Sequence, residues 1–131
     1  MDAGYSGTPQ AKKLGLVPGA RWDVVGASDD WAFEVDPDPE LRTDGDLDVV
    51  LAFVRTAAEV APTLEGLERR IFPAGALWMA WPRKAGGHVS DVDENLIRDT
   101  ALLRGLVDVK VAAIDADWSG LKIVWRVSNR G

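Results

Sequence analysis

The sequence predicts an α/β fold in three layers, with a mostly parallel sheet that carries an antiparallel hairpin at its C-terminal end. Two apolar runs, 49–54 and 76–81, flank a helical pattern and a Pro-Gly turn, which is typical of a parallel βαβ unit. Two later runs, 107–112 and 121–127, alternate apolar and polar residues across a turn-rich connection, which indicates antiparallel strands with one face in water. At this length we expect a single domain over residues 1–131.

The N-terminal part, residues 1–20, is predicted to form a short helix followed by a turn. Thr8 is a good capping residue, Pro9 suits the first helical position, and Gly15 ends the helical pattern. After the turn, a strand is expected over 21–26.

The region before the βαβ unit is expected to hold a weaker strand over 31–35 and an acidic loop over 36–47. Proline and aspartate alternate in the loop, which is too charged to be buried. Its carboxylates lack the glycine-centred spacing of a calcium loop and have no flanking helix pair, so no metal site is predicted.

Two further helices are indicated by their start signals. Thr56 with Glu59 forms a capping box after the first apolar run, and Ser90 with Asp93 forms a second one. We expect the second of these helices to end at Gly105.

Composition excludes several classes of function. Cysteine is absent and His88 is the only histidine, which excludes thiolate catalysis, Cys-rich zinc sites and disulfide frameworks. The 15 Lys plus Arg against 21 Asp plus Glu give a net charge of -6, which disfavours nucleic acid. No apolar run approaches the ~18 residues of a membrane span. We expect a soluble, cytoplasmic protein with neither a nucleic-acid nor a membrane partner.

Candidate ligand-binding residues follow the two apolar runs, because chemistry in such folds gathers at the carboxyl ends of parallel strands. Arg55 follows the first run, and Pro82 and Lys84 end the second. Arg55, Arg83 and Lys84 are candidate anion donors, and Asp91 and Glu94 lie at a helix start. The alternative is that the cations are solvated surface charges and the carboxylates complement the helix dipole. His88, beside two glycines, is either an acid/base partner of Asp91 or a solvated loop residue.

Tryptophan is unusually frequent, with six in the chain. Trp81 and Trp118, the latter followed by Ser119, lie near the expected sheet end, where a flat ring can stack on a planar ligand or meet a partner. No catalytic residue is assigned. The ligand-binding candidates from the strand ends are Arg55, Trp81, Pro82, Lys84, Asp91, Trp118 and Ser119.

A first resemblance concerns the order of elements. Segments 14–21 and 24–26 resemble the approach to the first strand of class I S-adenosylmethionine-dependent methyltransferases, 47–51 their fourth strand, and 71–77 the entry to their fifth. This implies a shortened, Rossmann-like methyltransferase fold. Gly26 matches the glycine-rich cofactor turn of that family, but the following residues depart from it, and the chain up to the first apolar run is too short for the cofactor-binding half. No cofactor is expected.

A second resemblance covers nearly the whole chain. The sequence contains YSGTP at 5–9, WPRK at 81–84 and WSGL at 118–121. These motifs resemble those of a bacterial family of small proteins known only as domain of unknown function 3052. The resemblance implies a cytosolic bacterial protein and brings no assigned activity with it.

Two classes of function follow. The first is a non-catalytic or regulatory binding module on a degenerate methyltransferase-like scaffold. The alternative is an enzyme that binds a small molecule or nucleotide, with S-adenosylmethionine among the candidates, at the C-terminal ends of the parallel strands. A small anionic ligand, a protein partner and a homodimer are left open as partners, because a shortened α/β domain leaves apolar faces uncovered.

Overall fold

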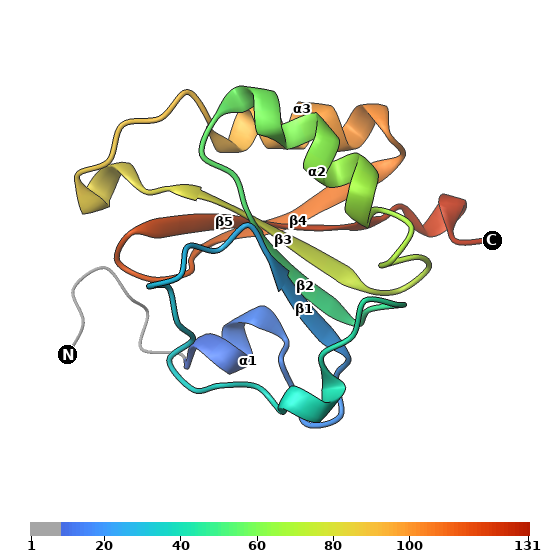
Figure 1. Cartoon of the computed structure of the whole chain (residues 1–131). Helices are drawn as coiled ribbons and strands as arrows, with labels where there is room; N and C mark the ends of the chain where they lie inside the picture. The colour runs from blue at the N-terminus through green and yellow to red at the C-terminus, as the bar shows by residue number, and fades with distance from the viewer. Residues whose placement is uncertain (1–8) are drawn as a thin grey trace.

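A computed structural model describes residues 9–131, which fold into one five-stranded mixed sheet with three α-helices (Figure 1). Four short 3-10 helices, η1 to η4, connect these elements. The α-helices are α1 (Gln10–Leu14), α2 (Val60–Leu67) and α3 (Glu94–Leu103), and the strands are β1 (Trp22–Val25), β2 (Val49–Phe53), β3 (Ala76–Pro82), β4 (Leu106–Ala113) and β5 (Trp118–Trp125).

The strand order β1-β2-β3-β5-β4 corrects the predicted fold class. β1, β2 and β3 run parallel, but β5 pairs antiparallel with β3, and β4 pairs antiparallel with β5. Half of the pairings are therefore antiparallel. The predicted three-layer, mostly parallel, Rossmann-like fold is wrong, and so is the shortened class I methyltransferase fold, because the chain has few helices and forms a mixed sheet.

The two faces of the sheet are covered in different ways (Figure 1). Helices α2 and α3 pack on one face, where their apolar side chains, Leu64 and Ile97 among them, join a core with strand residues such as Leu121. The five-residue α1 and the long connection between β1 and β2 cover the other face, which holds a second core around Trp78 and Phe53. This face of the sheet is therefore covered by one short helix and a mainly coil segment instead of a layer of helices.

The parallel βαβ unit is confirmed, since β2, α2 and β3 follow one another and the two strands pair in parallel register. The hairpin of β4 and β5 is also present. Helix α1 ends as expected at Gly15, which adopts the left-handed conformation with φ of 84°. The proposed cap Thr8 lies outside the described residues.

The predicted strand over 31–35 is wrong. This stretch is coil that lies on the second core, where the ring of Trp31 makes edge contacts with those of Phe33 and Phe53, at centroid distances of 4.8 Å each. The alternation of aromatic and polar residues reflects packing of a coil on a sheet face, and periodicity alone does not separate the two.

The helix starts differ from the predicted capping boxes. Asp93, and not Ser90, caps α3, because its Oδ1 accepts a hydrogen bond of 2.9 Å from the Leu96 amide. Thr56 makes no side-chain capping bond, so the first box is wrong as well. In its place Glu59 accepts from the backbone amide of Arg55 at 2.6 Å.

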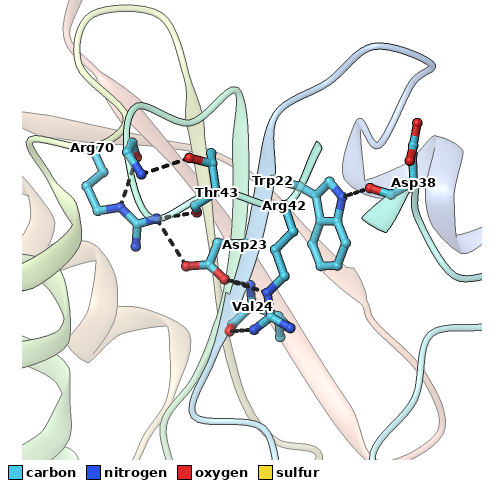
Figure 2. A network of polar contacts seen from close by, with 8 residues as sticks. Trp22, Asp23, Val24, Asp38, Arg42, Thr43 and Arg70 are labelled. Carbon is cyan, nitrogen blue, oxygen red and sulfur yellow. Dashed lines mark hydrogen bonds and ion pairs between the residues drawn. The ribbon is translucent and has the colours of Figure 1, made fainter. Parts of the chain in front are cut away.

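The acidic loop is fastened to the edge strand β1 by a network of polar contacts (Figure 2). Asp23 of β1 accepts hydrogen bonds of 3.0 Å from both Arg42 and Arg70, and its side chain is only 13% exposed. Arg70 also donates to the carbonyl of Thr43 at 2.7 Å, and Arg42 forms a single parallel bridge with Trp22. The backbone of this loop is thus held in place although its carboxylates face water.

Candidate functional site

The strand ends bring most of the predicted residues to one margin of the sheet. In the register of β3 and β5, Trp81 lies opposite Ser119 and Pro82 opposite Trp118. The amide of Val54 donates to the carbonyl of Ala80 at 2.9 Å, which continues the β2–β3 ladder towards the next residue of each strand. Arg55, Pro82 and Trp118 therefore follow one another across the margin.

The sheet itself separates these residues into two groups. Trp81 belongs to the core under α2 and α3, whereas Trp118 packs against the core on the α1 side. Ser119, opposite Trp81, shares its face, since successive strand residues point to opposite sides. A ligand that contacts Ser119 and Lys84 on the α3 side cannot also lie on the ring of Trp118.

The group on the α3 side lines a pocket of about 390 Å³, the strand-end pocket. It opens between the end of β3, the following turn and the first turn of α3. Of the predicted residues it includes Trp81, Lys84 and Ser119. The full lining is Trp81, Arg83, Lys84, Ala85, Val92, Asp93, Glu94, Asn95 and Ser119.

The cations and carboxylates of the strand-end pocket differ in their availability. Arg83 makes only one long side-chain contact, 3.5 Å to the carbonyl of Ala116, and within residues 9–131 Lys84 has no side-chain hydrogen bond or ion pair. Asp93 is engaged as the α3 cap, and Glu94 pairs with Arg98. Both acids are therefore already engaged, whereas the two cations can accept a new partner.

The Glu94 ion pair belongs to a larger cluster on α3 and β4. Hydrogen bonds from Arg98 to Asp108 and to Glu94 raise the pKa of Arg98 above its usual value. The same guanidinium holds the pKa of Asp108 below its usual value, chiefly through its hydrogen bond. This cluster keeps the Glu94 carboxylate directed along the helix.

The first turn of α3 adds backbone donors to the strand-end pocket. The amide of Leu96 is bonded to the Asp93 side chain, and that of Ile97 to the Asp93 carbonyl. The first amides of a helix have no intrahelical partner. The N–H groups of Glu94 and Asn95 are thus left for water or a ligand.

On the α1 side, the guanidinium of Arg55 lies over the ring of Trp118, with 5.2 Å between Cζ and the ring centroid. Its Nη1 donates to the carbonyl of Gly26 at 2.8 Å. A Cβ at Gly26 would lie 2.6 Å from the carbonyl oxygen of Phe53. Gly26 therefore permits the ends of β1 and β2 to approach each other closely. Because its carbonyl already accepts a hydrogen bond from Arg55, the turn at Gly26 does not form an open glycine-rich loop for a cofactor.

Asp91 and His88 have separate partners. Asp91 accepts from the backbone amide of Ala57 at 2.8 Å and so supplies the start of the η2–α2 segment with a cap. The ring of His88 lies 2.9 Å from Asp117. His88 and Asp91 therefore form no acid/base pair with each other, and the Asp91 carboxylate is engaged by the Ala57 amide.

Arg83 was expected from the sequence as an anion donor, because it directly follows the second apolar run, and it does line the pocket. Asn95 was missed. Asn95 contributes through its backbone amide at a helix start, and no side-chain motif marks such a donor.

Among residues 9–131 there is no group of three or more His, Cys, Asp or Glu side chains that could hold a metal ion. No helix in this part of the chain is both long and apolar enough to cross a bilayer. No protein-family model matches the sequence, and no curated protein matches it. The resemblance to the family of domains of unknown function stays a prediction.

Proposed function

We propose that this chain is a non-catalytic binding module whose strand-end pocket takes a small anionic ligand. The observation that carries the proposal is the pair of neighbouring cations, Arg83 and Lys84, which line a pocket of about 390 Å³ with no carboxylate partner among the described residues. A volume of this order accommodates a small molecule.

The donors that surround the pocket suit an oxyanion. Arginine offers a planar fork of N–H groups, and lysine offers a mobile point charge. The amides of Glu94 and Asn95 lie at the positive end of the α3 dipole, which favours negative charge by about 0.3–1 kcal/mol at an exposed position. The hydroxyl of Ser119 adds a neutral donor beside them.

The non-catalytic part of the proposal is supported by the hydrogen bonds of the same residues. Across residues 9–131, the Ser119 hydroxyl has no hydrogen bond to a base, and His88 is paired with Asp117 outside the pocket lining. A nucleophile requires a base within hydrogen-bond reach, which itself must be oriented by a third group. A binding role needs only the cations and amides described above.

The test is a thermal-shift titration with inorganic phosphate, pyrophosphate and citrate as probes. A ligand of the native state at 100 times its dissociation constant stabilises by about 2.7 kcal/mol, so a saturable rise in Tm is expected for at least one probe. Replacing Arg83 and Lys84 together by methionine should weaken that binding at least tenfold, because both charge-assisted contacts are lost.

The matched control replaces Lys12, an exposed lysine on α1, together with Arg69, which is also exposed and outside the pocket lining, by methionine and so removes the same two positive charges. This variant should bind like the unmodified chain. Equal weakening by the control and the pocket substitutions would mean non-specific attraction and would overturn the proposal, as would the absence of any saturable shift. S-adenosylmethionine is titrated in the same way. A rise in Tm with this compound that is unchanged by the pocket substitutions would favour the enzyme alternative.

A further inference from the structure

The α1 side of the β4–β5 hairpin carries a partly uncovered patch, the hairpin face, formed by four residues from paired positions. Lys110 lies opposite Lys122, and Val107 lies opposite Val124. Lys122 pairs with Trp78 of the second core, so these side chains point to the α1 side of the sheet. Both valines are half-buried, and neither belongs to the second core.

The two lysines are an unfavourable pair within one chain. Like charges directly opposite each other in an antiparallel pair are destabilising. The ammonium of Lys110 lies 5.9 Å from the centroid of the Trp78 ring, and in the described part of the chain neither lysine forms an ion pair with a carboxylate. The hairpin face is thus basic and apolar at once, and its charge is not neutralised by these residues.

The same side of the molecule presents a surface of the opposite kind. Val35 is 72% exposed and stands between Glu34 and Asp36, and it lines a small apolar pocket with Val17 and Pro37. The two acids carry the charge opposite to that of the two lysines, and Val35 is apolar like the two valines of the hairpin face. The two surfaces are therefore complementary in charge and alike in their apolar part.

Helix α1 stands between the two surfaces. Gln10 exchanges hydrogen bonds with Glu34 on one side, at 2.9 and 3.0 Å, and donates to the carbonyl of Ile114, just beyond β4, on the other. The segment around Val35 therefore flanks α1 opposite the hairpin and is separated from the hairpin face of its own chain.

We propose that the chain forms a two-fold homodimer in which the segment Glu34, Val35 and Asp36 of each copy docks on the hairpin face of the other. A two-fold axis through the α1 side places each surface against its complement twice, so the contact closes at two copies. Apolar burial of the three valines supplies affinity, and the charges set orientation.

A second copy fits better than an unrelated anion because both halves of the contact are present on one chain. The net charge of -6 repels two copies at long range, but at physiological ionic strength the Debye length is about 8 Å. Contacts between Asp36 and the lysines persist at that salt, whereas the long-range repulsion is screened.

The experiment is sedimentation equilibrium of the full chain at physiological salt. The expected mass is twice the chain mass of 14.2 kDa. Replacing Lys110 and Lys122 together by glutamate should weaken dimerisation at least tenfold, and Asp36→Lys should also weaken it. Mixing these two variants should restore a dimer, because one contact of the mixed pair keeps both native partners and the other joins the two reversed partners, whose charges are again opposite.

The control variant carries the same change in charge elsewhere, with Arg69 and Lys84 replaced by glutamate; both are exposed, and neither lies on the hairpin face. It should remain dimeric. A chain that stays monomeric at the highest reachable concentration overturns the proposal, and so does a dimer that tolerates the lysine reversal or a mixture that is not restored. Circular dichroism of each variant separates loss of contact from loss of fold, and restoration by mixing requires folded partners.

Discussion

Among single residues, Gly26 illustrates how a residue selected for binding can instead be required by the backbone. Its φ of +76° lies in the left-handed region, and its Cα faces the Phe53 carbonyl at the end of the neighbouring strand. Only a residue without Cβ allows this approach without strain. The glycine lets β1 end directly beside β2.

Replacing Gly26 by alanine should lower the free energy of unfolding by roughly 2–4 kcal/mol, since a left-handed alanine and a backbone clash add up. Chemical denaturation measures this change. The control is Gly87→Ala, because Gly87 has a φ of +87° but no atom within 4 Å of the added Cβ. That variant should cost about 1–2 kcal/mol. Equal losses for both would show that the close approach to Phe53 contributes nothing.

The candidate site could be predicted in part at this scale. The position of Arg55 and Lys84 after apolar runs placed them at the same margin of the sheet, and the structure agrees. Trp118 and Ser119 were grouped together, although neighbours on a strand must face opposite sides. Strand alternation was therefore the sequence signal that separates the two halves of the site.

At the scale of elements, Asp91 joins the loop before α3 to the segment that begins α2. Replacing Asp91 by alanine should destabilise the fold by about 1 kcal/mol, the usual cost of losing a helix cap, because the Ala57 amide loses its acceptor. Asp91→Asn should retain most of the stability, since the amide oxygen can still accept. Denaturant midpoints at neutral pH measure both.

Asp99→Ala is the control for this prediction, because Asp99 is exposed on α3 and makes no ion pair among the described residues. It should leave stability nearly unchanged. If Asp91→Ala behaves like Asp99→Ala, the hydrogen bond to Ala57 does not stabilise the protein.

Elements with strong local signals were predicted well and those with competing signals were not. The five buried residues of β2 read as a strand because a parallel strand between covered faces is continuously apolar. Both Ser90 and Asp93 are capping residues, and local sequence does not decide which one begins α3. The structure selects Asp93, while Ser90 donates to the carbonyl of Arg55 at 2.9 Å.

At the scale of the whole molecule, ion pairs couple stability to acid pH. Hydrogen bonds from the Arg21 side chain and then its backbone amide lower the pKa of Asp48, and the Arg98 side chain lowers the pKa of Asp108. An unfolded aspartate titrates near pH 3.9. In the acid range the unfolded state therefore binds more protons, so stability rises with pH and is lost as pH falls through the folded-state pKa values.

Asp108→Asn should weaken the dependence of unfolding free energy on pH in the acid range. The loss in unfolding free energy relative to the unmodified chain should be largest above about pH 5 and should shrink as pH falls below about 3.9 and through the folded-state pKa of Asp108, below which both chains carry a neutral group. Urea denaturation across this range measures the difference. A difference independent of pH would mean that the Arg98 contact acts through packing alone. The Asp48 contribution, at a half-exposed pair, should weaken with added salt.

The global order of strands could not be deduced from local patterns. The two hairpin strands alternate in polarity, which predicted their pairing, but nothing in that pattern says which of them pairs with β3 or how much of the sheet becomes antiparallel. The missing layer of helices on the α1 side had a visible cause, since the chain between β1 and β2 carries too many prolines and aspartates for a helix. This composition was a better guide to the α1 side of the sheet than the resemblance to the methyltransferase fold.

The parallel bridge between Arg42 and Trp22 has a consequence for solubility. An open strand margin is a template for fibre growth, and proteins block it with short strands, charges or covering loops. At the β1 margin the loop held by Asp23 and Arg70 covers the four-residue strand. At the other margin β4 is irregular between Asp108 and Lys110, which interrupts its ladder. Both margins of the sheet thus discourage the endless strand-by-strand addition of copies.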